Sequence, residues 1–221
     1  MVGASALIDD DDLMPVLAAY TVTVTEGAPA PVVVSLSHRS SQDVVFAWVT
    51  TPVSASSGVD YTAVGPISAT IPAMALAITL SVATLDDPSD EPNETVNVDI
   101  SGVTGASGTP TSQVLIIDND SAPLIYISDA SVAEGGSLAF EVSLSTASGF
   151  AVTFGYGTAD GTALNADSDY VHIVSGADGF VPGQLTIMIY VQSNQDTKYE
   201  NDETLTVDIN SPTNASIGDG S

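Results

Sequence analysis

The chain is dominated by apolar and polar residues that alternate with a period of two, and helical periodicity is nearly absent. In the stretch 204–209, Leu205, Val207 and Ile209 fall on one side of an extended chain, and Thr206 and Asp208 fall on the other. Such alternation predicts β-strands that turn one face to a core. We expect strands at 20–25, 31–37, 44–49, 75–83, 95–100 and 113–117, and again at 124–132, 138–144, 152–156, 185–191 and 204–209.

The segments between these strands are rich in Gly, Pro, Asp and Ser. Turn residues that recur about every 8–12 residues are typical of an all-β sandwich. The expected fold class is therefore all-β, with two antiparallel β-sandwiches in tandem that are joined near residues 121–123.

Short acidic motifs occur twice in the chain, about 109 residues apart. Asp60-Tyr61 recurs as Asp169-Tyr170 (169 − 60 = 109), and Glu94-Thr95 recurs as Glu203-Thr204 at the same spacing. Glu26-Gly27 recurs as Glu134-Gly135 at a spacing of 108. A period near 100 residues corresponds to a domain and is too long for a solenoid repeat. The 221 residues therefore divide into two domains of ordinary size.

The repeat also sets the domain boundaries that we expect. Residues 13–120 form the first domain, and residues 121–221 form a second domain that lacks its final strand and has an open edge. Residues 1–12 are interpreted as the remnant of a preceding repeat, because Ala4 to Ile8 followed by Asp9 to Asp12 resembles 113–117 followed by Asp118-Asn119-Asp120. The chain then looks like a piece of a longer protein. We also expect the remnant to fill the missing strand in a neighbouring molecule, in head-to-tail self-association.

The charge of the chain limits its partners. Twenty-eight acidic residues stand against two basic ones, so the formal net charge is −26. Nucleic acid is excluded as a ligand, because two cations cannot neutralise a phosphate backbone. Anionic membrane surfaces are disfavoured for the same reason. The longest nearly apolar stretch, 72–85, is too short for a transmembrane helix, so membrane insertion is not expected. There is no cysteine, and no secretory signal is visible.

Acidic residues that keep register through two divergent copies indicate a shared role. Carboxylates from several loops are typical ligands of Ca²⁺, and alternate loops of a sandwich emerge at the same end. Many carboxylates gathered there raise one another's pKa unless cations bind. The alternative is a set of solvated acidic turns, since Asp, Asn, Ser and Pro are common turn residues. The recurrence of the whole set favours calcium.

The same motifs carry a resemblance to a known family. The order Val-Thr-Glu-Gly, Gly-x-Asp-Tyr, Asp-Asp-x-x-x-Glu-x-x-Glu-Thr and Ile-Asp-x-Asp, with strands between, resembles the Calx-beta domain. Thr158 to Ala163, before Asp169, is especially typical of that family. The resemblance implies immunoglobulin-like sandwiches of the kind found in sodium–calcium exchangers, in an integrin subunit and in arrays in bacterial surface proteins. It also implies calcium at the end where the terminal Asp run meets the next domain.

Position by position, the resemblance implies a set of ligands in each copy. In the first copy the side-chain ligands are Glu26, Asp60, Asp86, Asp87, Glu91, Glu94, Asp118 and Asp120, with the backbone carbonyl of Ser89. In the second copy they are Glu134, Asp169, Asp196, Glu200 and Glu203, with the carbonyl of Lys198. Gln195 stands where the first copy has Asp86, and the terminal Asp run is missing. Fewer charges predict weaker calcium binding in the second copy.

Other kinds of site fit the sequence less well. Neither Asp run has the Gly and Glu spacing of an EF-hand loop. Glu91 and Glu94 as a glycosidase pair would need a sugar cleft rich in aromatic residues, which make up only 6% of the chain. His38 and His172 have no nucleophilic partner in the sequence, so we expect them at surface or edge positions. Trp48, aligned with Tyr156, is expected in a sandwich core.

We therefore expect a non-enzymatic, calcium-binding tandem module. In this interpretation the ions stiffen a structural or adhesive stalk of a large extracellular or cell-surface protein, and the partners are Ca²⁺ and neighbouring repeats of the same chain. The location follows from the resemblance alone. The alternatives are a regulatory calcium sensor of a membrane transporter, and an accessory module of a secreted hydrolase.

Overall fold

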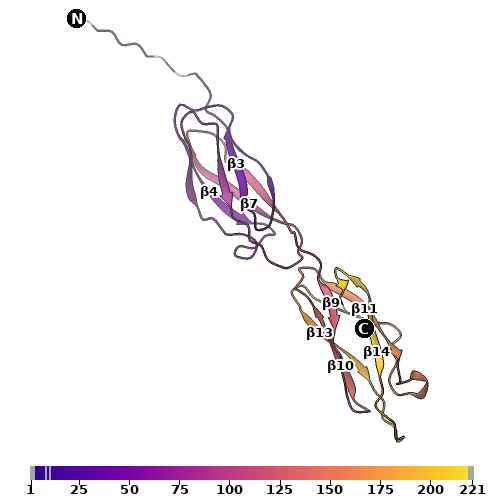
Figure 1. Ribbon diagram of the computed structural model, residues 1–221. Coiled ribbons are helices and arrows are strands. Elements are labelled where there is room, and N and C mark those ends of the chain that lie inside the picture. The colour runs from indigo at the N-terminus through magenta and orange to yellow at the C-terminus, as the bar shows by residue number, and fades with distance from the viewer. Residues whose placement is uncertain (1–2, 8, 10, 219–221) are drawn as a thin grey trace. The chain divides into compact units, whose positions relative to one another are not determined.

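The computed structural model describes residues 3–7, 9 and 11–218. Ile8 and Asp10, both in the expected N-terminal remnant, lie outside the described residues. The described chain is built of β-strands with one 3-10 turn, η1 (Asn165–Asp167), and it holds no helix that is long and apolar enough to cross a membrane. The contacts divide it into two compact units, residues 1–86 with 93–117, and residues 87–92 with 118–221 (Figure 1).

The first unit is a sandwich of two sheets. One sheet has the strand order β1-β3-β6, and the other has the order β2-β8-β7-β4-β5. All neighbouring strands are antiparallel except β2 and β8, which run parallel with Val22 opposite Val114. The strands are β1 (Leu17–Ala19), β2 (Val22–Thr25), β3 (Ala30–Leu36), β4 (Val44–Pro52), β5 (Ile67–Ile71), β6 (Ala77–Val82), β7 (Glu94–Thr104) and β8 (Thr111–Ile117).

Alternating residues of these strands build the core of the first unit. In β3 the burial pattern alternates residue by residue, so Val32 and Val34 are fully buried between the sheets. Phe46 and Trp48 of β4 are buried in the same core, which confirms the expected place of Trp48. Burial of this apolar surface holds the two sheets together.

The second unit repeats the architecture with fewer strands in one sheet. Its sheets have the orders β13-β10-β9-β15 and β12-β11-β14. The core contains Phe154, Val207 and Ile209, and the alternation that the sequence predicts around Leu205 is confirmed. The strands are β9 (Leu124–Ile127), β10 (Ser137–Leu144), β11 (Val152–Asp160), β12 (Gly176–Phe180), β13 (Thr186–Gln192), β14 (Leu205–Thr213) and β15 (Ser216–Ile217).

One predicted strand is shorter than expected. The sequence predicts a strand over 124–132, but β9 ends at Ile127, and residues 128–132 belong to no strand. Their counterpart in the first unit is β2, which is a strand because it pairs with β8. The described part of the second unit has no strand equivalent to β8. The prediction for 128–132 was therefore wrong because strand formation depends on a pairing partner as well as on alternation.

Candidate metal centres

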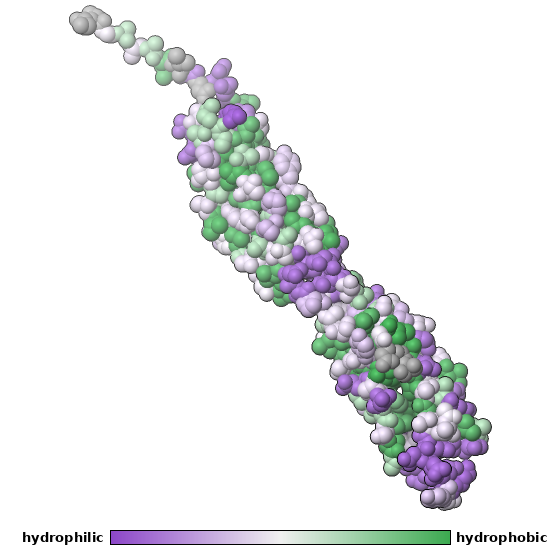
Figure 2. Space-filling view, in the orientation of Figure 1, coloured by the Kyte–Doolittle hydropathy of each residue, from purple (hydrophilic) through white to green (hydrophobic). Residues whose placement is uncertain are grey.

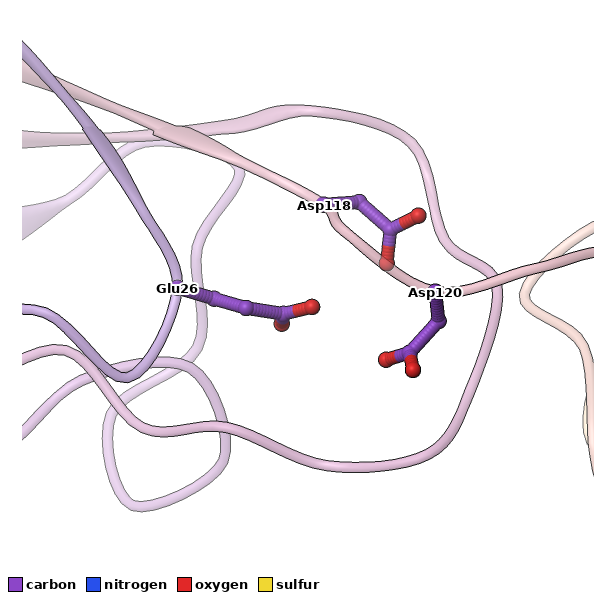
Figure 3. Close-up of side chains that lie close together, drawn as sticks. All are labelled: Glu26, Asp118 and Asp120. Atoms are coloured by element: carbon purple, nitrogen blue, oxygen red, sulfur yellow. The ribbon is translucent and has the colours of Figure 1, made fainter.

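Glu26 and the run that begins at Asp118 lie together because the strands before them are paired. Beyond the ends of β2 and β8, the backbone N–H of Glu26 donates a hydrogen bond to the carbonyl oxygen of Ile117 at 3.0 Å. Carboxylate oxygens of Glu26, Asp118 and Asp120 lie within 4.8 Å of one another (Figure 3). Two oxygens that bind the same Ca²⁺ are at most about 4.8 Å apart, since each Ca–O distance is about 2.4 Å. This separation therefore fits a single ion.

The surroundings of Asp120 favour a cation at this point. The side chains of all three acids are half-buried. Oδ2 of Asp120 is buried and accepts no hydrogen bond from any residue that the structure describes. A buried carboxylate oxygen is costly unless a donor or a cation compensates it. A bound cation would supply that compensation.

Asp90 belongs to the same acidic region, although the expected ligand set omits it. Burial raises the pKa of Asp90 above its ordinary value, and the negative charges of Asp118 and Asp120 raise it further. In the sequence, the position of Asp90 within the acidic run 86–94 is what indicates that it belongs to this region. The pattern of the resemblance assigns no ligand to that position.

Equivalent turns order the loops in both copies. The backbone N–H of Ser89 donates to Oδ1 of Asp87 at 2.8 Å, and the N–H of Lys198 donates to Oδ1 of Asp196 at 2.7 Å. Asp87 and Asp196 are 109 residues apart, so both copies use the same Asx-type turn. The turn fixes one oxygen of each Asp to the backbone.

Gly27 and Gly135 allow the loops that contain Asp86 and Gln195 to pack closely against the residues that follow Glu26 and Glu134. Gly27 and Gly135 both have positive φ, 72° and 80°. A Cβ on Gly27 would lie 2.9 Å from Cβ of Asp86, and a Cβ on Gly135 would lie 3.0 Å from Cβ of Gln195. Gly is therefore required for both the backbone conformation and the close contact. The two copies have the same geometry here, with an amide in place of a carboxylate in the second.

In the second unit, three acids gather around the loop that follows β13. One oxygen each of Glu134, Asp196 and Glu200 lies within 4.8 Å of the others. Hydrogen bonds hold Glu134 in place, because Oε1 accepts from the N–H of Asp196 at 3.0 Å and Oε2 accepts from Nε2 of Gln195 at 3.1 Å. This group is thus built around a fixed carboxylate.

A second group in this unit shares Glu200. Asp169, Glu200 and Glu203 also offer oxygens within 4.8 Å of one another. Oδ2 of Asp169 accepts a hydrogen bond from the N–H of Leu164 at 2.7 Å, which orders the loop before it. Burial raises the pKa of Glu203, and the charges of Asp169 and Glu200 raise it further. Like charges held this close favour a cation between them.

Lys198 brings a positive charge to the same acids. Its Nζ lies 3.5 Å from Oδ2 of Asp196 and 3.6 Å from Oε1 of Glu200. The charges of Glu200 and then Asp196 raise the pKa of Lys198. The family resemblance implies only the backbone carbonyl of Lys198 as a ligand, and nothing in the sequence indicates this role of the ammonium group. A tethered ammonium competes with a metal ion for the same oxygens.

The structure brings part of the expected ligand set together. All five acids expected in the second copy fall in the two groups that share Glu200, and in the first copy Glu26, Asp118 and Asp120 form a group. The carbonyls of Ser89 and Lys198 remain predictions. So does weaker binding by the second copy. Within the described residues, five further expected ligands fall outside these groups of three, namely Asp60, Asp86, Asp87, Glu91 and Glu94.

The two histidines have ordinary structural contacts. His38 is exposed, and its Nε2 lies 2.8 Å from the carbonyl oxygen of Leu13. His172 is half-buried, and its Nδ1 lies 3.0 Å from Oγ1 of Thr158. The surface position expected for His38 is confirmed, whereas His172 packs partly inside the second unit.

Polar surface gathers at the loop ends of each unit, while the sides of the sandwiches are mixed (Figure 2). The fold and these groups together define a class of protein, a tandem β-sandwich with acidic clusters in its loops. The model of the Calx-beta domain matches the chain twice, over residues 9–120 and 118–218. The chain belongs to the Calx-beta family.

The solved structures to which the chain is similar include three of Calx domains. The crystal structure of CBD12 from CALX1.2 is 18% identical over 90% of this chain and 80% of that one, with a TM-score of 0.45. The structure of calcium binding domain CBD12 of CALX1.1 is 19% identical over 89% and 79%, with a TM-score of 0.45. The apo form of the Calx CBD1 domain is 17% identical over 49% of this chain and all of that one, with a TM-score of 0.44. No curated protein matches the chain.

Proposed function

We propose that the chain is a non-enzymatic calcium-binding module whose ions are held by the acidic groups of both copies. The observation that carries the proposal is the recurrence of carboxylate groups with the spacing of calcium ligands. Glu26 and its counterpart Glu134 each belong to a group whose oxygens lie within 4.8 Å of one another. Buried Oδ2 of Asp120 and the raised pKa of Glu203 add a need for positive charge in each copy.

Oxygen-only ligands favour Ca²⁺ over other common ions. Carboxylates and carbonyls are hard donors. The described groups come from several loops, which suits the irregular coordination of Ca²⁺ better than the strict octahedron of Mg²⁺. The chain has no cysteine, so a thiolate site for Zn²⁺ is excluded.

In the proposed role, calcium makes the tandem stiffer. Asp118 and Asp120 directly follow β8 and precede β9, so an ion bound to them and to Glu26 restrains the short connection between two strands of different sandwiches. Such restraint suits a structural or adhesive stalk of an extracellular or cell-surface protein. Neighbouring repeats of the same chain are then the main partners.

A regulatory sensor is the second candidate function. CBD12 of CALX1.1 is described as a calcium-binding domain. In a transporter, a tandem of domains would use bound calcium to change its conformation, whereas in a stalk bound calcium would keep the conformation fixed. The proximity of Asp90 to Asp118 and Asp120 favours this alternative, because their negative charges repel one another and a bound ion would relieve that repulsion. The loop could then change its conformation when calcium binds. An accessory module of a secreted hydrolase remains a third proposal.

Calorimetric titration of chelator-treated protein with Ca²⁺ tests the proposed function. We expect saturable binding and a higher melting temperature, because an ion at about 100 times its dissociation constant stabilises the folded state by about 2.7 kcal/mol. Glu26→Gln and Glu134→Gln should each remove part of the heat. Glu141→Gln is the matched control, because Glu141 is an exposed acid of β10 outside the groups. Absence of both heat and a higher melting temperature at millimolar calcium would refute calcium binding.

The stalk and the sensor predict different effects of the bound ion. Small-angle scattering with and without calcium measures the spread of conformations of the tandem. A stalk predicts that calcium narrows the distribution around one extended form. A sensor predicts a change from one average form to another.

A further inference from the structure

The motif Thr158 to Ala163 contains none of the expected ligands, yet it leads into the loop that carries Asp169. Strand β11 ends at Asp160, and residues 161–170 form the loop that returns to the core at Tyr170. Tyr170 is buried, and the acid directly before it belongs to one of the groups of three. The conformation of this loop therefore decides where that acid lies.

One carboxylate oxygen of Asp160 fastens the loop at two points. Oδ1 of Asp160 accepts a hydrogen bond from the backbone N–H of Asn165 at 2.9 Å and another from the hydroxyl of Tyr170 at 2.6 Å. Between these two points, Oδ2 of Asp169 accepts a hydrogen bond from the N–H of Leu164 at 2.7 Å. Because both carboxylates close the same segment of chain, the side chain of Asp169 is held in one direction.

Thr162, two residues after Asp160, fastens the backbone beside another acid of the group. Oγ1 of Thr162 accepts a hydrogen bond from the N–H of Thr204 at 2.8 Å, and the N–H of Ala163 donates to the carbonyl oxygen of Thr204 at 2.9 Å. The Gly before Thr162 permits this approach, because a Cβ there would collide with the same carbonyl oxygen. Thr204 directly follows Glu203, so the motif also fixes the chain at that candidate ligand.

Only part of this arrangement recurs in the first unit. Oγ of Ser54 accepts a hydrogen bond from the N–H of Thr95 at 2.8 Å, as Thr162 does from its own partner. The position of Asp160 is taken by Thr51, 109 residues earlier. The hydroxyl of Thr51 donates to a carboxylate of β7 at 2.7 Å instead of holding the loop. The contact made by Asp160 is therefore a property of the second copy.

The equivalent acids Asp60 and Asp169 differ in the same way. Asp169 falls in a group of three acids, whereas Asp60 falls in none within the described residues. The hydroxyl of Tyr61, next to Asp60, is buried with no hydrogen-bond partner in the part of the chain that the structure describes. The acid of this loop thus gathers with other ligands in the copy that has Asp160.

We propose that Asp160 is a positioning residue for the calcium group of the second unit, and that Thr162 assists it. Asp160 itself binds no ion. It holds the loop so that Asp169 faces Glu200 and Glu203 before calcium arrives. Hydrogen bonds that orient metal ligands from outside the coordination sphere typically contribute about 10–100-fold to metal affinity. The calcium part rests on the proposed function, whereas the ordering of the loop needs no ion.

Two substitutions at Asp160 separate positioning from charge. Asp160→Ala and Asp160→Asn both remove one negative charge, but only Asn keeps an Oδ1 that accepts hydrogen bonds. Asp160→Ala should therefore weaken calcium binding by the second unit about tenfold or more, and Asp160→Asn should retain most of the affinity. Asp178→Ala is the matched control, because Asp178 is an exposed acid of β12 that also accepts a backbone hydrogen bond but lies outside the groups. It should leave the affinity unchanged.

Calorimetric titration well below the melting temperature measures these affinities. Glu26→Gln is present in every protein, so that the remaining heat reports mainly the second unit. A change that only destabilises the fold lowers the melting temperature without altering the dissociation constant of the folded protein for calcium. Equal losses of affinity in Asp160→Ala and Asp160→Asn would overturn the proposal, because charge would then account for both. An unchanged dissociation constant in Asp160→Ala would overturn it as well.

Hydrogen exchange in chelator tests the positioning without calcium. Asp160→Ala should speed the exchange of the N–H of Leu164, which donates to Asp169, and Asp178→Ala should not. Unchanged exchange at Leu164 in Asp160→Ala would overturn the proposal. If the second unit bound no calcium, the proposed function would fail there, while faster exchange at Leu164 would still support the role of Asp160 in holding Asp169.

Discussion

Tyr61 and Tyr170 are equivalent residues that differ in their hydrogen bonding. Both side chains are buried, at 0% and 2% exposure, and both follow a candidate ligand, Asp60 or Asp169. The hydroxyl of Tyr170 donates to Oδ1 of Asp160 at 2.6 Å. The hydroxyl of Tyr61 is buried with no hydrogen-bond partner among the described residues. The tyrosine hydroxyl at this position thus has a hydrogen-bond partner in the second copy and none among the described residues in the first.

Removal of the two hydroxyls should have opposite effects. Tyr61→Phe removes an unsatisfied group, so we expect the first unit to gain up to about 1 kcal/mol in free energy of unfolding. A change of that size moves the melting temperature of a domain of this length by roughly 4–8 °C. Tyr170→Phe loses a hydrogen bond and should lower the stability of the second unit. Calorimetry of each variant measures both transitions, and destabilisation by Tyr61→Phe would contradict this account.

The Asp160–Tyr170 pair should make the second unit sensitive to acid. The hydrogen bond from Tyr170 lowers the pKa of Asp160, and one from the N–H of Asn165 lowers it further. A lowered folded-state pKa gives stability that is present above the unfolded-state value and is lost as the pH falls through the folded-state value. Asp160→Asn should therefore flatten the acid side of the stability curve.

The same pair also makes the stability of the second unit depend on pH at the alkaline end, where stability is lost as the pH rises. Burial raises the pKa of Tyr170, and the hydrogen bond to Asp160 raises it further. This contribution is complete below the ordinary pKa of tyrosine and is lost as the pH rises through the folded-state value. Melting temperatures measured across the pH range check both sides. An Asp160→Asn curve parallel to that of the unchanged protein would contradict the assignment.

Lys198 should weaken calcium binding in the second unit. Its ammonium lies within 3.6 Å of both Asp196 and Glu200, so a divalent ion must displace it. We expect Lys198→Ala to lower the dissociation constant of that unit for calcium at low ionic strength, and added salt to reduce the difference. Lys198→Arg keeps the charge and is the control. Titration calorimetry measures the affinities, and weaker binding by Lys198→Ala would show that Lys198 supports the site instead.

Gly27 should be required for both stability and calcium binding. Alanine there meets a positive φ, which costs about 1–2 kcal/mol, and displaces Asp86 by contact at 2.9 Å. Gly102→Ala is the control, because Gly102 also has a positive φ but has no atom within 4 Å of an added Cβ. Both variants should lose stability, and only Gly27→Ala should also lose calcium affinity. Equal calorimetric affinities for the two would exclude a role for the contact with Asp86.

The sequence predicts strands where apolar and polar residues alternate over enough positions to show a clear period of two. The strand around Val207 has three apolar positions on one side and appears as β14. By contrast, β12 has the sequence Gly-Ala-Asp-Gly-Phe, and β1 has only three residues, so neither gives a periodic signal. Both form because a neighbouring strand offers a backbone edge. Pairing of this kind is decided by the tertiary fold, which local alternation does not contain.

The candidate site was predicted to the extent that it depends on residue type and register. Glu134, Asp196 and Glu200 were identified because they match acids of the first copy, and they do lie together. The proximity of Asp90 to Asp118, and the direction of the Lys198 side chain, depend on loop conformation. Neither follows from spacing along the chain.

The position of β8 has a consequence for how the first unit is made. This strand is the last of its unit in the sequence, yet it lies inside the sheet and pairs with β2, where Val22 is opposite Val114 and 114 − 22 = 92 residues separate them. During synthesis, the edges of β2 and β7 remain unpaired until residue 117 has left the ribosome. Contacts this distant in sequence also make folding slow. The nascent first unit is therefore exposed to mispairing with other chains until its last strand arrives.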